Sequence, residues 1–151
     1  MWRAGFDAAP SFPLHPPAHI VFYEVVTPVL ILSEAPIVPA SAVFLPEEGA
    51  EVQFLGMVRG SEDGKVITGI DYSAYLPMAD KMLNDLAQRG RSEHGPHRLF
   101  IQHRLGFVAA EEPSILIRVA TKHSAEAFEL CRWYLKEIKT HVPIWKRAVF
   151  A

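Results

Sequence analysis

The sequence predicts an α+β domain in which helices pack on a mainly antiparallel sheet. Three observations carry this prediction. Short apolar runs with strand-like alternation fall mostly in adjacent pairs, two longer segments have helical periodicity, and the order is strand, hairpin, helix, strand pair, helix, strand. Adjacent strands joined by short turns pair antiparallel, so the helices are expected to cover the resulting sheet.

The predicted strands are bounded by turn residues. The segment 50–59 alternates apolar and polar positions, and an Asp-Gly turn at 63–64 is expected to join it to the next strand as a hairpin. The acidic turn AAEE, at 109–112, is expected to join another pair. Strands are predicted at 28–37, 50–59, 66–75, 97–108, 113–122 and 144–150.

Two helices are predicted, at 77–90 and 124–139. Pro77 suits the first turn of the first helix, and Gly90 suits its end. In the second helix Ser124 is the expected N-cap. Its buried stripe is expected to consist of Phe128, Cys131, Leu135 and Ile138.

Length and composition indicate one globular domain with an appendage. The chain has 151 residues, of which 50% are hydrophobic and 21% charged, and a net charge of −2. Residues 1–28 read as a proline-rich N-terminal extension, and residues 29–151 as the domain. The net charge excludes general recruitment of nucleic acid, so an anion site must be a local cluster. The absence of a long uncharged apolar segment argues against a membrane span.

A single cysteine excludes an internal disulfide framework and a cysteine-based zinc site, and favours a cytoplasmic location. Cys131 lies within a helical stripe, which favours a buried thiol over a nucleophile. His94 and His97 are separated by Gly95 and Pro96 and have no further ligand nearby, so a surface loop is favoured over a metal site. No metal is predicted.

The glycine-rich segment 56–66 does not have the spacing of a nucleotide-binding loop. Arg59, however, lies at a strand end beside a glycine turn, where it can bind an anion or remain an exposed edge residue. His103 and Arg104 are neighbours on a strand, so they point to opposite faces and at most one should face the core. His123 precedes the second helix, where free amides favour anions, and it reads equally well as a plain capping-region residue.

Two lysines flank a reversal near the end of the printed sequence. Lys139 closes the second helix, and Lys146 follows Pro143 and Trp145. Both amines could converge on one pocket walled by Trp145, where a partly dry lysine can act as acid, base or oxyanion stabiliser. On residue types alone, a helix-capping lysine and an exposed strand lysine explain them slightly better.

Five motifs occur in order between about Val29 and Arg147. They are GMVR (56–59), YLPMA (75–79), HRLG (103–106), HSAEAF (123–128) and KTHVPIWK (139–146). Together they resemble the MoaE family, the large catalytic subunit of molybdopterin synthase. The resemblance implies an α/β hammerhead-type fold and a homodimer of large subunits within a heterotetramer. Each large subunit would bind a small ubiquitin-like sulfur carrier, whose C-terminal Gly-Gly tail ends in a thiocarboxylate.

The activity implied is transfer of sulfur from that tail to cyclic pyranopterin monophosphate, forming the molybdopterin dithiolene without a metal or organic cofactor. The resemblance makes Lys139 and Lys146 the catalytic pair. It places Arg59, Arg104, His123 and His103 at or near the substrate pocket, with Phe54, Pro143 and Trp145 as its walls. Both substrates are anionic, which explains a local cationic site in a slightly negative protein.

Two positions depart from the family pattern. Ser124 stands where the family usually has an arginine, and Ser73 stands where an acidic residue is expected. The loss of a cation at position 124 keeps one alternative open, a non-catalytic paralogue that still binds a ubiquitin-like carrier tail. A generic phosphate-ester-binding α+β domain is the other alternative, and the pair of lysines makes it the weaker one.

Overall fold

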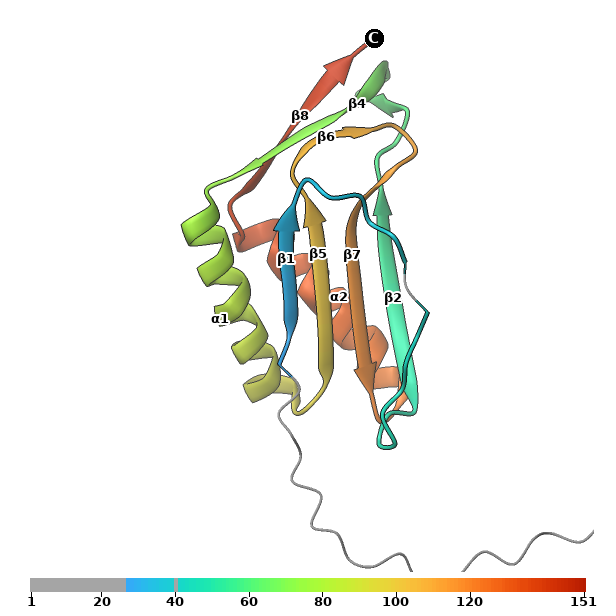
Figure 1. Cartoon of the computed structure of the whole chain (residues 1–151), viewed down its shortest axis with the longest axis vertical. Helices are drawn as coiled ribbons and strands as arrows, with labels where there is room; N and C mark the ends of the chain where they lie inside the picture. The colour runs from blue at the N-terminus through green and yellow to red at the C-terminus, as the bar shows by residue number, and fades with distance from the viewer. Residues whose placement is uncertain (1–26, 40) are drawn as a thin grey trace, which may run out of the picture.

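The computed structural model describes residues 27–39 and 41–151. The expected N-terminal extension, residues 1–28, therefore lies almost wholly outside the described residues. Within them, two sheets and two helices form an elongated molecule, with the second sheet at the end that carries the C-terminus (Figure 1). The predicted α+β class is confirmed.

The first sheet has the strand order β1-β5-β7-β2. Its pairs are antiparallel except β1 with β5, which is parallel. The sheet is thus mainly antiparallel, as predicted. The strands are β1 (Val29–Ser33), β2 (Ala50–Met57), β5 (Arg98–Arg104) and β7 (Pro113–Thr121).

The second sheet is built around β4 (Lys65–Ala74). One stretch of β4, Gly69 to Tyr72, pairs with both β6 (Gly106–Ala109) and β8 (Ile144–Phe150), so these strands occupy its two edges. β3 (Ser61–Glu62) forms the predicted hairpin with the start of β4. The turn residues Asp63 and Gly64 have φ of 48° and 76°, the left-handed conformation that an Asp-Gly hairpin turn requires.

The segment 97–108 is not one strand, as the sequence predicted, but two strands in different sheets. β5 ends at Arg104, and β6 begins at Gly106, which has φ of 71°. A left-handed residue breaks the pleat, and glycine adopts it without strain. The chain thereby passes from the first sheet to the second.

Both helices belong to the first sheet. α2 (Ser124–His141) packs across β7 and β2, while α1 (Leu76–His94) lies against α2 and β1 (Figure 1). Pro77 lies in the first turn of α1, as predicted. α1 runs on past Gly90 to His94, and Gly95, with φ of 84°, follows it. Neither helix is long and apolar enough to cross a membrane.

The start and the buried face of α2 differ from the prediction. Ser124 is the first helical residue, and His123 occupies the N-cap position without a side-chain cap bond. Phe128 is 66% exposed. A slightly rotated stripe is buried instead, because α2 packs against both the first sheet and α1. The buried residues of α2 are Ala127, Leu130, Cys131, Tyr134 and Ile138.

The described residues form two separate apolar cores. The larger core lies between the first sheet and the helices and includes Leu83, Ile117 and Tyr134. The smaller core contains four buried residues, Val58, Ile67, Ile70 and Val108, with Tyr72 and Ala148 packed against them. It holds the second sheet together.

His97 is buried rather than exposed in a loop, contrary to the prediction. Its Nδ1 donates to the carbonyl oxygen of Gly95 at 2.8 Å, which leaves Nε2 to accept from the Tyr134 hydroxyl at 2.7 Å. Burial lowers the pKa of His97, so the neutral ring fits this arrangement. His97, which the sequence placed in a surface loop, therefore forms a buried hydrogen bond that connects the start of β5 to α2.

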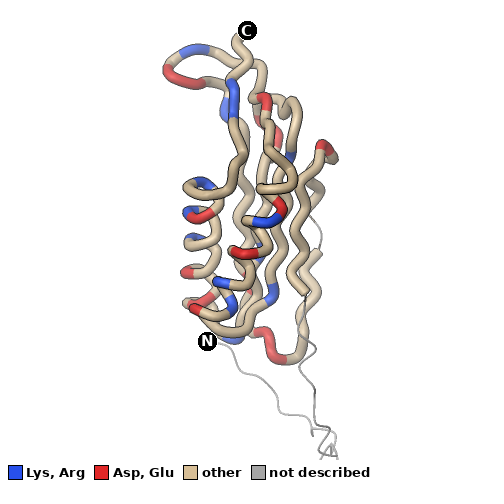
Figure 2. Tube along the Cα trace, turned by 90° about the vertical axis from the view of Figure 1, so that its left-hand side faces the viewer, with Lys and Arg blue, Asp and Glu red and all other residues tan. Residues whose placement is uncertain are grey.

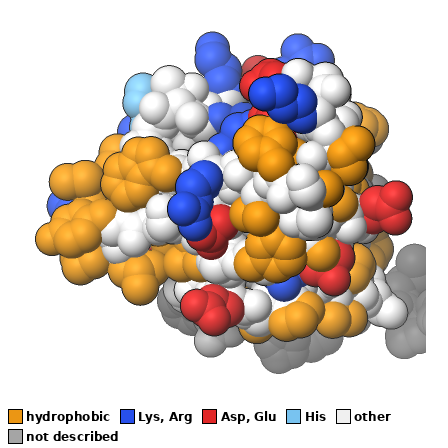
Figure 3. Space-filling model, turned by 90° about the horizontal axis from the view of Figure 1, so that it is seen from above, with side chains coloured by type: hydrophobic (Ala, Val, Ile, Leu, Met, Phe, Trp, Pro, Cys, Tyr) orange, Lys and Arg blue, Asp and Glu red, His pale blue; other side chains and the backbone are white. Residues whose placement is uncertain are grey.

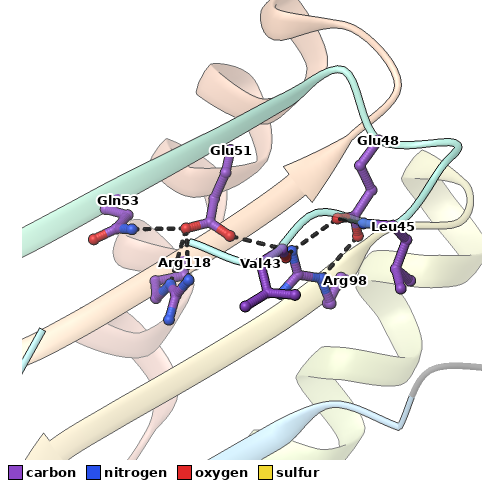
Figure 4. A network of polar contacts seen from close by, with 7 residues as sticks. All are labelled: Val43, Leu45, Glu48, Glu51, Gln53, Arg98 and Arg118. Carbon is purple, nitrogen blue, oxygen red and sulfur yellow. Dashed lines mark hydrogen bonds and ion pairs between the residues drawn. The ribbon is translucent and has the colours of Figure 1, made fainter. Parts of the chain in front are cut away.

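A charged network ties the loop before β2 to the first sheet (Figure 4). Glu51 is 3% exposed and lies between Arg98 and Arg118, at 3.2 and 2.9 Å. Arg98 also binds Glu48 and donates to the carbonyl oxygen of Val43 at 2.6 Å. Burial of these charges is tolerated because each has a partner of opposite sign.

Candidate functional site

Two of the predicted cations meet on the second sheet. Lys146, on β8, and Arg59, just after β2, both contact the carboxylate of Glu62 in the β3–β4 hairpin. Figure 2 shows basic and acidic positions together at this end of the molecule, and Figure 3 shows basic side chains beside acidic ones amid apolar surface. The sequence did not point to Glu62, because nothing before folding connects a hairpin residue to a strand 84 positions later.

Lys139 lies in the last turn of α2, where its side chain is exposed. Across residues 27–39 and 41–151 it makes no ion pair, and its ammonium group faces solvent. α2 ends at His141 because Pro143 disfavours helical geometry at the preceding residue, and Val142 is accordingly extended, with ψ of 128°. β8 begins immediately afterwards, so the end of α2 leads directly into the strand that carries Lys146.

Trp145 and Lys146 are consecutive residues of β8, so their side chains point to opposite faces of the sheet. The pairing agrees with this, since Lys146 lies opposite Tyr72 and Trp145 lies opposite Ser73. Trp145 is 56% exposed. Within one chain, Trp145 therefore does not flank the Lys146 amine, and its role as a pocket wall stays a prediction.

Phe54 lines a mainly apolar groove of about 570 Å³ between β2 and α2. Leu135, one helical turn before Lys139, lines the same groove and lies on the same face of α2 as that lysine. Lys139 itself does not line the groove, but it lies one turn beyond it on the same helix face. Sequence reasoning identified Phe54 but expected Phe128 and Leu135 only as buried core residues; Phe128 is exposed and Leu135 is half-buried, and both line the groove.

Cys131 also lines this groove, but burial raises the pKa of its thiol. A neutral thiol is a poor nucleophile, which supports the expectation that Cys131 is structural. Among the described residues, no group of three or more His, Cys, Asp or Glu side chains could hold a metal ion.

His103 and Arg104 are both buried, each about 8% exposed, although they are neighbours on a strand and at most one was expected to face the core. The reason is that β5 ends where the second sheet begins, which covers the face that would otherwise be open. His103 Nδ1 donates to the carbonyl oxygen of Arg104 at 2.7 Å, and its ring packs edge-on against Tyr72. Burial lowers the pKa of His103.

Arg104 is already paired within the chain. Its Nη1 donates to Glu112 Oε2 at 2.7 Å, while its buried Nε has no hydrogen-bond partner among the residues that the structure describes. The Nε–H of the guanidinium is therefore an unused donor beside the ion pair.

His123 is exposed at the start of α2, whereas Lys139 is in the last turn of that helix. With a rise of 1.5 Å per residue, the two positions are about 24 Å apart. One chain alone therefore cannot bring His123 to Lys139.

The comparisons with known proteins agree with this architecture. The family model described as "MoaE protein" matches residues 32–141. A "Molybdopterin synthase catalytic subunit" of Thermoplasma volcanium is 38% identical over 104 residues, which are 69% of this chain and 76% of that protein. The protein of the same name from Arabidopsis thaliana is 37% identical over 108 residues, 72% of this chain, and the chain spans only 54% of its length.

Solved structures show the same fold. The crystal structure of molybdopterin synthase from Staphylococcus aureus superimposes with a TM-score of 0.74 at 26% identity, over 81% of this chain and 91% of that one. A complex of subunits 1 and 2 of molybdopterin-converting factor from Helicobacter pylori gives 0.58 at 25% identity, over 70% and 73% of the two chains. With the family model covering most of the domain, the chain belongs to the MoaE protein family.

Proposed function

We propose that this chain is the large subunit of molybdopterin synthase and transfers sulfur from the C-terminal thiocarboxylate of a small ubiquitin-like carrier to cyclic pyranopterin monophosphate, forming the molybdopterin dithiolene. The observation that carries the proposal is the free Lys139 ammonium group on the same face of α2 as Leu135, which lines the apolar groove. Relatives bearing the name of the catalytic subunit support it.

The groove suits the carrier's tail. An extended Gly-Gly tail has no side chains to exclude and could pass between groove walls such as Phe54 and Leu135. Its anionic end would then need a cation as partner. Lys139 would supply that charge. Its ammonium group would bind the thiocarboxylate, stabilise negative charge during transfer and exchange protons at the reacting pterin carbon.

Lys146 and Arg59 would act on the second anion. They flank one carboxylate at 2.6 and 3.1 Å, a spacing at which both can also contact one phosphate group. Lys146 would position the substrate and stabilise an oxyanion, while Arg59 would bind its phosphate. Direct substrate contacts by Arg104 and His103 stay predictions, since Arg104 would have to exchange Glu112 for the substrate or use its free Nε.

The separation along α2 favours a homodimer. His123 can join the site of Lys139 only if a second copy supplies it. The second copy could also supply Trp145, on β8, and Pro143, just before that strand. We therefore propose that two large subunits form the centre of a heterotetramer, each binding one small carrier subunit. The Helicobacter pylori complex, which contains two different subunits, supports a small-subunit partner.

The reaction proposed here requires no metal or organic cofactor from this chain, and a cytoplasmic location stays a prediction. One alternative retains support, a non-catalytic paralogue that binds a carrier tail. The observation that favours it is Ser124, an exposed uncharged residue beside His123, where the family pattern has an arginine.

The test mixes the chain with thiocarboxylated carrier and the pterin precursor and follows dithiolene formation in a single turnover. We expect Lys139→Ala to slow transfer by about 10²-fold or more, because it removes the charge at the reacting centre. Carrier binding should persist, and the free energy of unfolding should change by less than about 0.5 kcal/mol, since the side chain is exposed and unpaired.

Lys136→Ala is the matched control, because Lys136 is an exposed lysine three residues earlier on the same helix. It should leave transfer unchanged. Near-normal transfer by the Lys139 variant would refute the catalytic assignment. Carrier binding without any turnover by the unmodified chain would support the paralogue instead.

A further inference from the structure

Glu62 occupies an unusual position in the candidate site. It lies in the two-residue strand β3, and the Asp63–Gly64 turn directs this hairpin toward β8. Its Oε1 accepts from Lys146 Nζ at 2.6 Å, and its Oε2 accepts from Arg59 at 3.1 Å. One carboxylate thus uses each oxygen for a different cation.

The exposure of the three side chains is unequal. Lys146 and Arg59 are 59% and 76% exposed, whereas Glu62 is only 19% exposed. The hydrogen bond from Lys146, with a further contribution from Arg59, lowers the pKa of Glu62, so the carboxylate is ionised at neutral pH. Among the described residues, no other carboxylate forms an ion pair with either cation.

This arrangement has a consequence for any anionic ligand. An ammonium and a guanidinium group held on two sides of one carboxylate present the donors that a phosphate group would use. Glu62 is covalently part of the site, so it is always present at high effective concentration. An incoming anion must either displace the carboxylate or bind against its negative charge.

We propose that Glu62 is a built-in counter-anion that occupies the substrate-phosphate position between Arg59 and Lys146 and is displaced when the anionic substrate binds. Glu62 then sets how tightly the substrate binds, and it keeps stray anions from occupying the cationic pair. The inference rests on the proposed function for the identity of the substrate, but the competition itself concerns any phosphate.

The first measurement therefore uses inorganic phosphate and needs no turnover. Phosphate is titrated into the full chain at constant ionic strength, and the dissociation constant is obtained from NMR shifts of the Lys146 and Arg59 side chains. In Glu62→Gln we expect the dissociation constant to fall about three- to fivefold, the range that loss of one exposed ion pair and one repelling charge allows.

Asp71→Asn is the matched control. Asp71 forms an ion pair of 2.8 Å with Arg147 across the same two strands, β4 and β8, one register position from Lys146. The substitution removes the same charge but leaves Arg59 and Lys146 paired with Glu62, so phosphate affinity should stay within about 1.5-fold of the unmodified chain. Glu62→Asp keeps the charge and should stay within about twofold.

Two results would overturn the proposal. One is a Glu62→Gln variant that binds phosphate no more tightly than the Asp71→Asn control. The other is a gain in affinity whose NMR shifts lie away from Arg59 and Lys146. Either would make Glu62 an ordinary surface partner of these side chains.

The same variants then separate this inference from the proposed function. In the sulfur-transfer assay, Glu62→Gln should lower KM by the same factor and leave kcat within about twofold, a split that a merely structural change would not produce. Tighter phosphate binding with no transfer by any variant would support the counter-anion and refute the proposed function. Sulfur transfer by Glu62→Gln with an unchanged KM would support the proposed function and refute the counter-anion.

Discussion

Gly90→Ala should be among the most damaging single-methyl additions in this chain. Gly90 is buried on α1 and faces α2. A Cβ at this position would collide with Tyr134 Oη well inside van der Waals contact and would lie 2.7 Å from Tyr134 Cζ and 3.2 Å from a ring carbon of Trp133. These are rings fixed in the larger core, so they cannot simply turn away.

The size of the effect follows from three contributions. Overpacking a core typically costs about 1–3 kcal/mol. Displacing Tyr134 also breaks its buried bond to His97, which adds about 1–3 kcal/mol. Alanine is favoured over glycine inside a helix by about 1 kcal/mol, which offsets part of the loss. We expect a net loss of about 3 kcal/mol, equivalent to a fall in Tm of about 9 °C for a chain of this size.

Urea unfolding followed by circular dichroism measures the change, and Gly60→Ala is the control. No atom lies within 4 Å of the Cβ position at Gly60, so that variant should stay within about 0.5 kcal/mol. In a Tyr134→Phe background, which removes Oη, Gly90→Ala should cost at least 1 kcal/mol less. A neutral or stabilising Gly90→Ala, or a cost independent of the Tyr134 hydroxyl, would refute the reasoning.

Two further predictions concern buried charge. Burial lowers the pKa of His97 and His103, so the unfolded chain binds more protons than the folded chain below about pH 6.5. The free energy of unfolding should be flat above that pH and fall as pH drops toward the folded pKa values; urea midpoints that stay constant from pH 7.5 to 5 would contradict this. Glu51→Gln removes the carboxylate between Arg98 and Arg118 and should cost about 2–3 kcal/mol in the same assay. A loss below 0.5 kcal/mol would show that the two arginines do not depend on it.

The elements that sequence reasoning placed correctly are those whose signals are local. The Asp63–Gly64 turn needs left-handed backbone, Pro77 suits the start of a helix, and Pro143 ends one. Each follows from the geometry of one or two residues. These signals were sufficient for the fold class, because alternation and periodicity decide which segments become strands or helices.

The elements that it missed depend on contacts between distant segments. A strand pattern continues through Leu105, so only the second sheet explains why the chain leaves the first at Gly106. His103 and Arg104 alternate as expected, but the second sheet covers the face that would otherwise be open. For the candidate site, the sequence supplied Lys139, Lys146 and Arg59, and it could not supply Glu62, whose position depends on the pairing of β4 with β8.

The two separate cores imply two cooperative units of unequal strength. The strand that carries Lys146 is attached to β4 across 74 residues of sequence and rests on a core of only four buried residues. First-sheet pairs such as Val29 with Phe100 span a similar separation, so the smaller core is what makes this pairing open earlier than the larger core. Amide hydrogens of β8 should accordingly exchange through partial opening of the second sheet, while those of β5 and β7 should exchange only through global unfolding. Lys146 and Arg59, the residues proposed to bind the substrate phosphate, would then sit on the half of the protein that can rearrange without the half that carries Lys139.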